Sequence, residues 1–178
     1  HGLAVSGVDN FRTPLGMVPV ERDIEKALCE LPQVSVLALA HRYEHSLEVQ
    51  LPFLQVVLAS FSLVPLSVGS ASAHEVEEVL DRAWGGEETL IVISSGLSHY
   101  LSYDQARAVE GETRQAIEDL DFRGIDRDAA CGATPLGGLL ITAKRRDMRV
   151  TTLDMKNSGD TAGDRQYVVG YGSWEFVE

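Results

Sequence analysis

The chain has 178 residues, a formal net charge of −12 at pH 7, 44% hydrophobic residues and 24% charged residues, which is an ordinary globular composition. Its negative charge argues against nucleic acid or an anionic membrane surface as the main partner, because both are polyanions. No apolar run approaches the roughly 20 residues of a membrane-spanning helix, and the two cysteines lie in unlike contexts that do not suggest a disulfide framework, so we expect a cytoplasmic protein.

The first half of the chain alternates between strand and helix patterns. In chain order we predict a strand at 3–8, a turn at 13–16, a helix at 20–31, a strand at 34–39, a helix at 44–60, a strand at 63–69 and a helix at 73–84. Pro52 lies inside the predicted helix at 44–60, so it either kinks this helix or marks its true first turn.

The second half opens with the clearest predicted strand. The segment 89–95 is apolar throughout its centre, at 90–93, as expected of a strand that is buried on both faces. Helices at 104–120 and 135–146 and strands at 150–155 and 167–176 follow. This alternation predicts an α/β protein with a mixed, largely parallel central sheet flanked by helices. Because no linker is visible, we expect a single domain over residues 1–178.

Glu44 and His45 stand side by side where the predicted helix at 44–60 begins. His45 is a candidate metal ligand or acid/base group, because the pKa of a histidine normally lies near working pH. In the alternative interpretation, Glu44 is a charge favoured by the N-terminal end of the helix dipole, and His45 is an ordinary polar residue.

Two further segments have the character of a site. His99 follows the predicted strand at 89–95, with Ser95 before it and Tyr100 after it, and ligands of α/β sheets gather at the carboxyl ends of strands. Cys131 precedes a helix, where a thiolate serves as nucleophile or metal ligand. The plainer alternatives are a structural histidine and a small buried hydrophobe. Histidine, cysteine and glutamate are side chains that bind transition metals.

Other polar residues receive plainer interpretations. Cys29 lies on the apolar side of the helix at 20–31, so we expect it in the core. His74 lies in an acidic helix start and is expected to be solvated. The basic run 144–146 is interpreted as a solvated helix end that interacts favourably with the helix dipole.

The motifs together resemble those of the Memo family, whose bacterial members are often called AmmeMemoRadiSam system protein B. The central segment is Glu-His-Ser-Leu-Glu-Val-Gln-Leu-Pro-Phe-Leu at 44–54. The other matching segments, in order, are Phe-Arg-Thr-Pro-Leu-Gly at 11–16, Ser-Ser-Gly-Leu-Ser-His-Tyr at 94–100, Cys-Gly-Ala-Thr-Pro-Leu at 131–136, Asn-Ser-Gly-Asp-Thr-Ala-Gly-Asp at 157–164 and Val-Val-Gly-Tyr at 168–171. The resemblance spans the whole chain.

The resemblance implies a fold like that of the LigB-type class III extradiol dioxygenases, which are non-haem iron enzymes. It implies a pocket in which His99 and Cys131 are ligands of iron or of another transition metal such as copper. His45 would be a ligand or acid/base group in this pocket. The residues expected to line it are Glu44, Ser95 and Tyr100.

Two departures from the family pattern affect this expectation. The family begins with Pro-His-Ala-Gly-Tyr and Gly-Pro-x-His motifs that supply pocket histidines, and neither is present in this sequence. We therefore expect a family member that lacks the first βα region. The second departure is Gly96, which stands where family members usually carry an aspartate. An iron site needs about three protein ligands. The resemblance therefore favours a protein that binds a metal in this pocket over an enzyme that uses the metal for catalysis.

Three functions are consistent with these residues. The first is a metal-binding pocket protein that resembles non-haem iron dioxygenases and takes a small-molecule or peptide ligand. The second is a non-catalytic module that uses the same pocket to hold a peptide or partner, since eukaryotic family members are linked to signalling. The third is a nucleophilic enzyme in which Cys131 attacks and His99 acts as base. Substrate, metal identity and oligomeric state are not determined by the sequence.

Overall fold

The computed structural model describes residues 1–161 and 163–178 and divides them into two compact units. Unit 1 comprises His1–Ala71 and Asp81–Ser94, and unit 2 comprises Ser72–Leu80 and Ser95–Glu178. Helices and strands are both abundant, so the predicted α/β class is confirmed. The strands of the described residues form three small sheets, in which the β1–β4 pair is parallel and the other strand pairs are antiparallel. The prediction of one central, largely parallel sheet is therefore wrong for these residues. The single domain over 1–178 remains a prediction.

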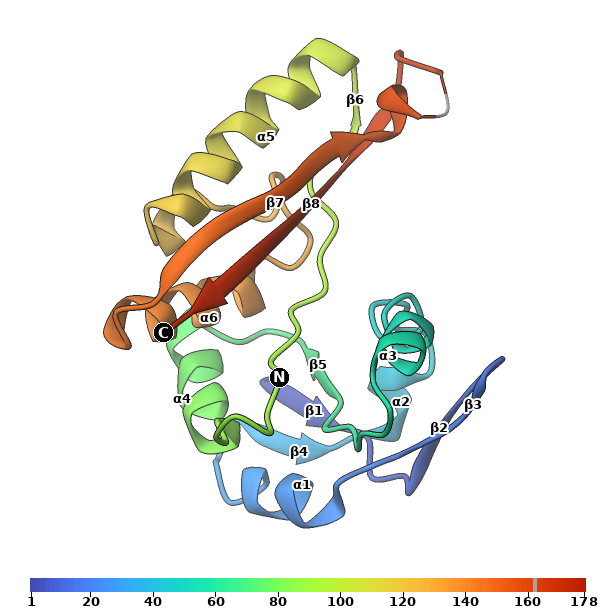
Figure 1. Ribbon diagram of the computed structural model, residues 1–178. Coiled ribbons are helices and arrows are strands. Elements are labelled where there is room, and N and C mark those ends of the chain that lie inside the picture. The colour runs from blue at the N-terminus through green and yellow to red at the C-terminus, as the bar shows by residue number, and fades with distance from the viewer. Residues whose placement is uncertain (162) are drawn as a thin grey trace. The chain divides into compact units, whose positions relative to one another are not determined.

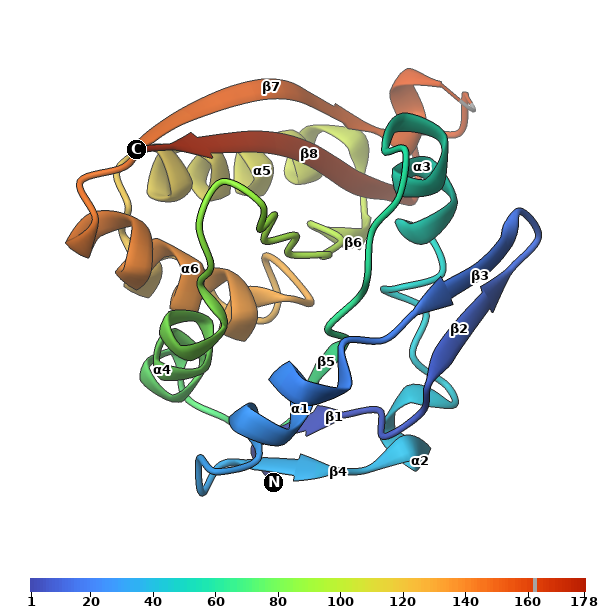
Figure 2. The same cartoon turned by 60° about the horizontal axis from the view of Figure 1, so that its bottom comes forward.

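Unit 1 is built on a short sheet with the strand order β4-β1-β5 (Figures 1 and 2). The bounds of its elements are β1 (Leu3–Val5), β2 (Asn10–Thr13), β3 (Gly16–Pro19), α1 (Arg22–Leu28), β4 (Val34–Val36), α2 (Ala38–His41), α3 (Leu51–Val57) and β5 (Leu66–Val68). Strands β2 and β3 pair as a hairpin around the predicted turn at 13–16. The turn ends at Gly16, whose φ of +131° favours glycine.

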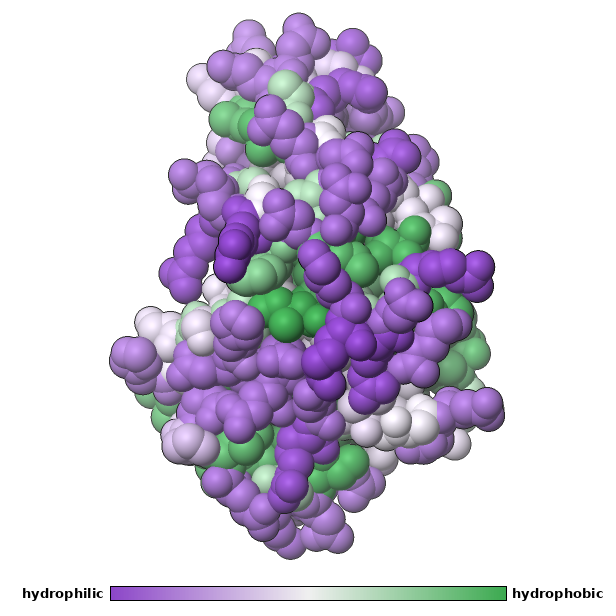
Figure 3. Space-filling model, turned by 90° about the vertical axis from the view of Figure 1, so that its left-hand side faces the viewer, coloured by the Kyte–Doolittle hydropathy of each residue, from purple (hydrophilic) through white to green (hydrophobic). Residues whose placement is uncertain are grey.

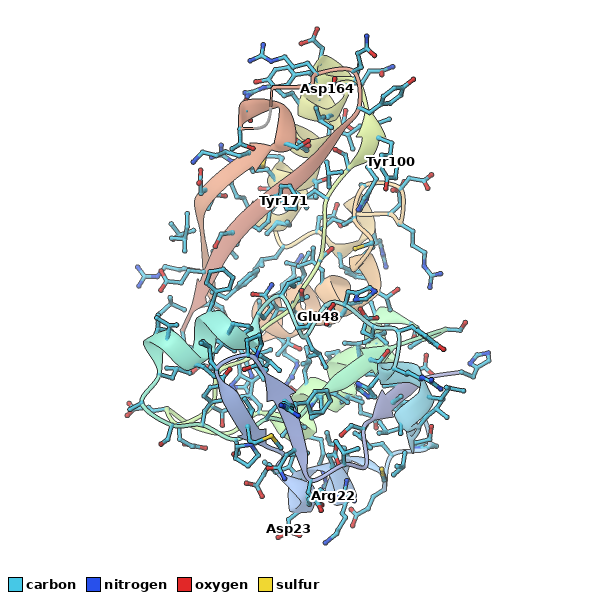
Figure 4. All side chains as sticks on the ribbon, turned by 90° about the vertical axis from the view of Figure 1, so that its right-hand side faces the viewer. Arg22, Asp23, Glu48, Tyr100, Asp164 and Tyr171 are labelled. Atoms are coloured by element: carbon cyan, nitrogen blue, oxygen red, sulfur yellow. The ribbon has the colours of Figure 1, made fainter. Side chains whose placement is uncertain are left out.

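A buried carboxylate ties α1 to the strand β1 region. Glu25 is 2% exposed and accepts hydrogen bonds from the backbone N–H and the hydroxyl of Ser6, at 3.0 and 2.9 Å. Arg22, labelled in Figure 4, donates to the other carboxylate oxygen. A buried charge is tolerated when it is paired and hydrogen-bonded, and Glu25 meets both conditions. Leu28 and Val5, both fully buried, lie in the apolar core of the same unit.

Unit 2 is a helix-backed antiparallel sheet. The bounds of its elements are α4 (Ala73–Ala83, of which the residues from Asp81 on belong to unit 1), β6 (His99–Leu101), α5 (Tyr103–Glu118), η1 (Phe122–Gly124), α6 (Ala133–Arg145), β7 (Arg149–Asn157), η2 (Ser158–Asp160) and β8 (Val168–Val177). The strand order is β6-β8-β7, and α5 lies along one face of the long β7–β8 pair (Figures 1 and 2).

Helices α4 and α6 approach each other closely in unit 2. A Cβ added at Gly138 would lie 2.4 Å from Cγ1 of Val76, so only glycine fits there. The core beneath includes Ile117 and Leu140, which are both fully buried. Within residues 1–161 and 163–178, no helix has both the length and the apolar character to cross a bilayer.

The predicted strand at 89–95 is wrong. These residues adopt no strand in the structure, and Leu90 is 65% exposed. The chain passes from unit 1 to unit 2 between Ser94 and Ser95. An apolar run shows a preference for burial, but a strand also needs a neighbouring strand for its hydrogen bonds, and none pairs with this segment among the described strands.

The predicted helix at 44–60 is shorter than expected. Helix α3 begins at Leu51, with Pro52 in its first turn, so Pro52 marks the true helix start. Glu44 and His45 therefore precede the helix by a full turn or more. Leu51, the first residue of this helix, is buried at 3% exposed. The predicted strand at 34–39 also ends early, because α2 begins at Ala38.

Candidate functional site

Gly96 lies between the two strongest candidate residues of unit 2. A Cβ added at this glycine would stand 3.1 Å from Cε1 and Nε2 of His99 and 3.8 Å from Sγ of Cys131. The imidazole and the thiol therefore flank the same small space, although they are 32 positions apart in the sequence. Both side chains belong to exposed residues, so this space is open to solvent. We call His99, Cys131, Gly96 and Ser95 the thiol–imidazole site.

Backbone hydrogen bonds hold the two segments of this site together. The N–H of Cys131 donates to the carbonyl oxygen of Gly96, and the N–H of Gly96 donates to Sγ of Cys131, both at 3.2 Å. The Ser95 hydroxyl accepts from the N–H of Gly132 at 2.9 Å and donates to the carbonyl of Gly96 at 2.7 Å. Its oxygen lies 3.8 Å from Sγ. The thiol is thus fixed by the loop that carries Ser95 and Gly96.

His99 enters the site from β6, which is irregular at this point. His99 pairs with Val169 and Leu101 pairs with Val168, so the register shifts between them. Tyr100 between them has a φ of 59°, in the left-handed region that few residues other than glycine adopt readily. Its side chain is 73% exposed (Figure 4), and its ring centroid lies 6.1 Å from that of His99.

A buried carboxylate lies under the segment that carries His99. Glu110 on α5 is 2% exposed and accepts a hydrogen bond of 2.8 Å from the fully buried hydroxyl of Ser98. A Cβ added at Gly170 would stand 2.2 Å from Oε1 of Glu110, so β8 needs a glycine opposite this carboxylate. The N–H of Gly170 also donates to the carbonyl of Ser98 at 2.9 Å. These contacts fix the position of the residue that precedes His99.

Glu110 was not recognised from the sequence, because it resembles the other acids of a polar helix. A signal was nevertheless present in the spacing. The buried residues of α5 include Ala106, Glu110, Thr113 and Ile117, which follow each other at intervals of four, three and four. An acid in register with an apolar helix face is a candidate for a buried, hydrogen-bonded role.

Glu44 and His45 lie in unit 1, in the turn before α3. The N–H of Ser46 donates to Glu44 at 2.8 Å, and this donation is the main reason that the pKa of Glu44 is lowered. His45 has an 80% exposed side chain, and its Nδ1 lies 2.5 Å from Oε1 of Glu48. Glu48 is labelled in Figure 4. The polar groups of this segment therefore satisfy one another locally.

The donors of the thiol–imidazole site do not by themselves form an iron site of the dioxygenase kind. Such a site uses about three protein ligands, two histidines and a carboxylate. Gly96 supplies no side chain, and within the part of the chain that the structure describes no group of three or more His, Cys, Asp or Glu residues comes together. Histidine nitrogen and cysteine sulfur instead match the donor preferences of softer ions such as copper and zinc.

The fold and this site define the molecule as an α/β protein with an exposed cysteine next to an exposed histidine. Residues 1–175 match the Memo-like protein family, and the chain belongs to this family. It is 33% identical to a MEMO1 family protein of Sulfolobus acidocaldarius over 93% of this chain and 63% of that protein. It is 35% identical to one of Methanosarcina barkeri over 96% and 69% of the two chains, and 34% identical to one of Aquifex aeolicus over 95% and 67%. The chain thus spans 63 to 69% of the length of these relatives.

Proposed function

We propose that this Memo-family chain binds one soft transition-metal ion through the imidazole of His99 and the thiolate of Cys131. The observation that carries the proposal is that a Cβ added at Gly96 would stand 3.1 Å from the His99 ring and 3.8 Å from Sγ of Cys131, so both donors border the same space. A bound ion would supply Lewis acidity or redox capacity there. The chain's own contribution is to hold the two donors side by side.

The backbone supports this role in the absence of a third side-chain ligand. The paired hydrogen bonds between Gly96 and Cys131 fix the thiol, and the Ser98–Glu110 pair fixes the residue before His99. A site held in this way needs little rearrangement to receive an ion. Because Gly96 has no side chain, part of the coordination sphere stays open to water or to an exogenous ligand.

Competition titration tests the proposal directly. Cu(I) is titrated anaerobically into the full chain in the presence of a chromophoric chelator, because thiolate and imidazole are both suitable ligands for copper. We expect one Cu(I) per chain. The variant Cys131→Ser should bind at least about 100-fold more weakly, since loss of outer hydrogen-bonding partners alone costs roughly 10- to 100-fold in metal affinity.

Cys29 provides the matched control. It is the other cysteine of the chain and lies in unit 1, where burial, more than the nearby Glu25, raises its pKa. The variant Cys29→Ser should bind Cu(I) as the wild type does. Equal affinity of wild type and Cys131→Ser would overturn the proposal. A protein that used this surface only to hold a partner would likewise show no Cu(I) binding that depends on Cys131.

A nucleophilic role for Cys131 is the second candidate, and the exposure of the thiol next to His99 favours it. It requires His99 to take the thiol proton as a general base. Iodoacetamide alkylation of the metal-free protein tests this role. Fast alkylation of Cys131 that is slowed by His99→Gln would support it. Alkylation at the rate of a free thiol, unchanged by His99→Gln, would remove it.

A further inference from the structure

A second candidate binding site lies in unit 2, away from the residues of the thiol–imidazole site. It is a pocket of about 390 Å³ between the start of α4, the turn after α5, η1 and the last turns of α6. Its lining residues are His74, Leu120, Asp121, Phe122, Arg123, Ile141, Lys144 and Arg145. We call it the η1 pocket. Its volume lies in the range of small-molecule sites.

The charge of the η1 pocket is opposite to that of the whole chain. Arg123, Lys144 and Arg145 line it with one carboxylate, Asp121, in a chain of net charge −12. Nε of Arg145 donates to Glu77 at 3.1 Å, whereas Lys144 makes no ion pair with any other described residue. This is a local concentration of positive charge on an acidic protein.

The dipole of α6 explains why some of these cationic residues stand where they do, but it does not explain all of them. Lys144 and Arg145 lie in the last turn of α6, where cations are favoured by the partial negative charge of about half a unit. Arg123 lies on η1, so the same argument does not apply to it. Its guanidinium stands 5.5 Å from the centroid of the Phe122 ring. Three full positive charges outweigh the half charge of one helix end.

The carboxylate in the lining is already engaged by its own turn. Oδ1 of Asp121 accepts a hydrogen bond from the N–H of Arg123 at 3.1 Å and so caps η1. Of the cationic side chains, Arg145 is already paired with Glu77, so Arg123 and Lys144 are the ones left to meet an incoming anion. Lys144 and Arg145 belong to the run 144–146, which was interpreted from the sequence as a solvated helix end, and these two residues form part of a pocket wall.

The remaining wall of the η1 pocket is apolar and partly aromatic. Phe122, Leu120 and Ile141 are half-buried. The His74 ring meets Phe122 edge-on, with centroids 5.8 Å apart and planes at 74°. Figure 3 views the side on which α4 and the end of α6 lie in Figure 1, and there hydrophobic residues adjoin strongly hydrophilic ones. A ligand with both a flat apolar part and an anionic group matches both walls.

We propose that the η1 pocket binds a small aromatic phosphate monoester, with its ring against Phe122 and its phosphate between Arg123 and Lys144. A dianion suits this pocket because Arg123 and Lys144 both line it, while Arg145 is paired with Glu77 and Asp121 is engaged by the Arg123 N–H. Aromatic rings stack well on aromatic and guanidinium planes. Phosphate accepts charge-assisted hydrogen bonds from arginine and lysine.

Isothermal titration of the full chain with phenyl phosphate tests this inference. We expect saturable binding that Arg123→Gln and Lys144→Gln each weaken about tenfold, as for the loss of a charge-assisted hydrogen bond. Both residues are exposed, so these variants should fold. Arg127→Gln makes the same charge change on an exposed residue of unit 2 that is not part of the lining, and it should bind as the wild type does.

Two further measurements distinguish specific binding in the η1 pocket from general attraction of anions, and distinguish this inference from the metal-binding proposal. Inorganic phosphate lacks the ring and should bind several-fold more weakly than phenyl phosphate. The variant Cys131→Ser should bind phenyl phosphate normally, because Cys131 is not part of the lining. The inference is overturned by absence of saturable binding, by unchanged affinity in both Arg123→Gln and Lys144→Gln, or by equal affinity for inorganic phosphate.

Discussion

His99 in unit 2 and His45 in unit 1 are both exposed imidazoles, but their neighbours differ. His45 pairs with Glu48, three residues away on the same turn. His99 faces a space shared with Cys131, a residue brought to it by another segment. His45 has its Nδ1 occupied by a neighbouring carboxylate. The fold places His99 next to a thiol from a distant segment, so the two can act as a pair of ligands. This difference is the reason that the proposed metal site uses His99 and not His45.

The largest expected effect is the loss of metal affinity in a histidine variant, and it tests the difference between His99 and His45 directly. His99→Gln should lower Cu(I) affinity by at least about 100-fold, because it removes one of the two proposed ligands. His45→Gln should change the affinity by less than about twofold, since its Nδ1 already faces Glu48. Chelator competition measures both constants. Comparable losses in the two variants would show that the two imidazoles contribute equally and would contradict the assignment.

The next largest effect is a loss of stability when the hydrogen bond between Ser98 and Glu110, next to His99, is removed. Ser98→Ala should destabilise the protein by about 1–3 kcal/mol, because it leaves the buried Glu110 carboxylate without its hydroxyl donor. Urea unfolding followed by circular dichroism measures the change. Ser173→Ala on β8 is the control, since this serine is exposed and should be neutral. A neutral Ser98→Ala would mean that Glu110 has no structural role here.

A smaller effect in the opposite direction is expected from Gly96→Asp. The new carboxylate would enter the space between His99 and Cys131 and supply a third ligand, which should raise Zn²⁺ affinity about tenfold. The His99 ring must shift by a few tenths of an ångström, because the added Cβ would stand 3.1 Å from it. Zinc competition titration measures the gain. Unchanged zinc affinity in a folded variant would place the metal elsewhere.

The smallest effect belongs to the His45 segment and depends on pH. The pKa of Glu44 is lowered chiefly by the Ser46 N–H, so the ionised carboxylate favours the folded state. That contribution is present above the unfolded pKa of about 4.3 and is lost as pH falls through the lower folded value. Glu44→Gln should therefore lower the urea midpoint slightly at pH 7 and leave it unchanged at about pH 3. A difference that persists in acid would point to another cause.

The long helices of unit 2 were predictable because their apolar residues repeat with the helical period. The β7–β8 pair was predictable because both segments are rich in β-branched or aromatic residues. The segment 89–95 was not, since its composition indicates burial but says nothing about a strand partner. The hairpin of β2 and β3 was missed except for its turn. Its residues have exposed or half-buried side chains apart from Val18, so no apolar alternation marks these strands.

The candidate site was partly accessible from the sequence. His99, Cys131 and Ser95 were identified from their positions and from the family resemblance, and the structure brings all three to Gly96. The buried Glu110 was marked only by its spacing on the apolar face of α5. The charge of the η1 pocket could not be predicted, because residues far apart along the chain, such as His74 and Lys144, line the same pocket.

The left-handed backbone of Tyr100 has a consequence for how His99 is presented. In a regular strand, neighbouring side chains point to opposite faces, yet His99 and Tyr100 are both exposed. The register shift of β6 permits this, and the φ of 59° at a bulky residue costs on the order of 1–2 kcal/mol. The exposed imidazole is thus followed directly by one unfavourable torsion angle. Tyr100→Gly should remove that cost and give the backbone next to His99 more freedom, so the imidazole would be held less firmly beside the cysteine.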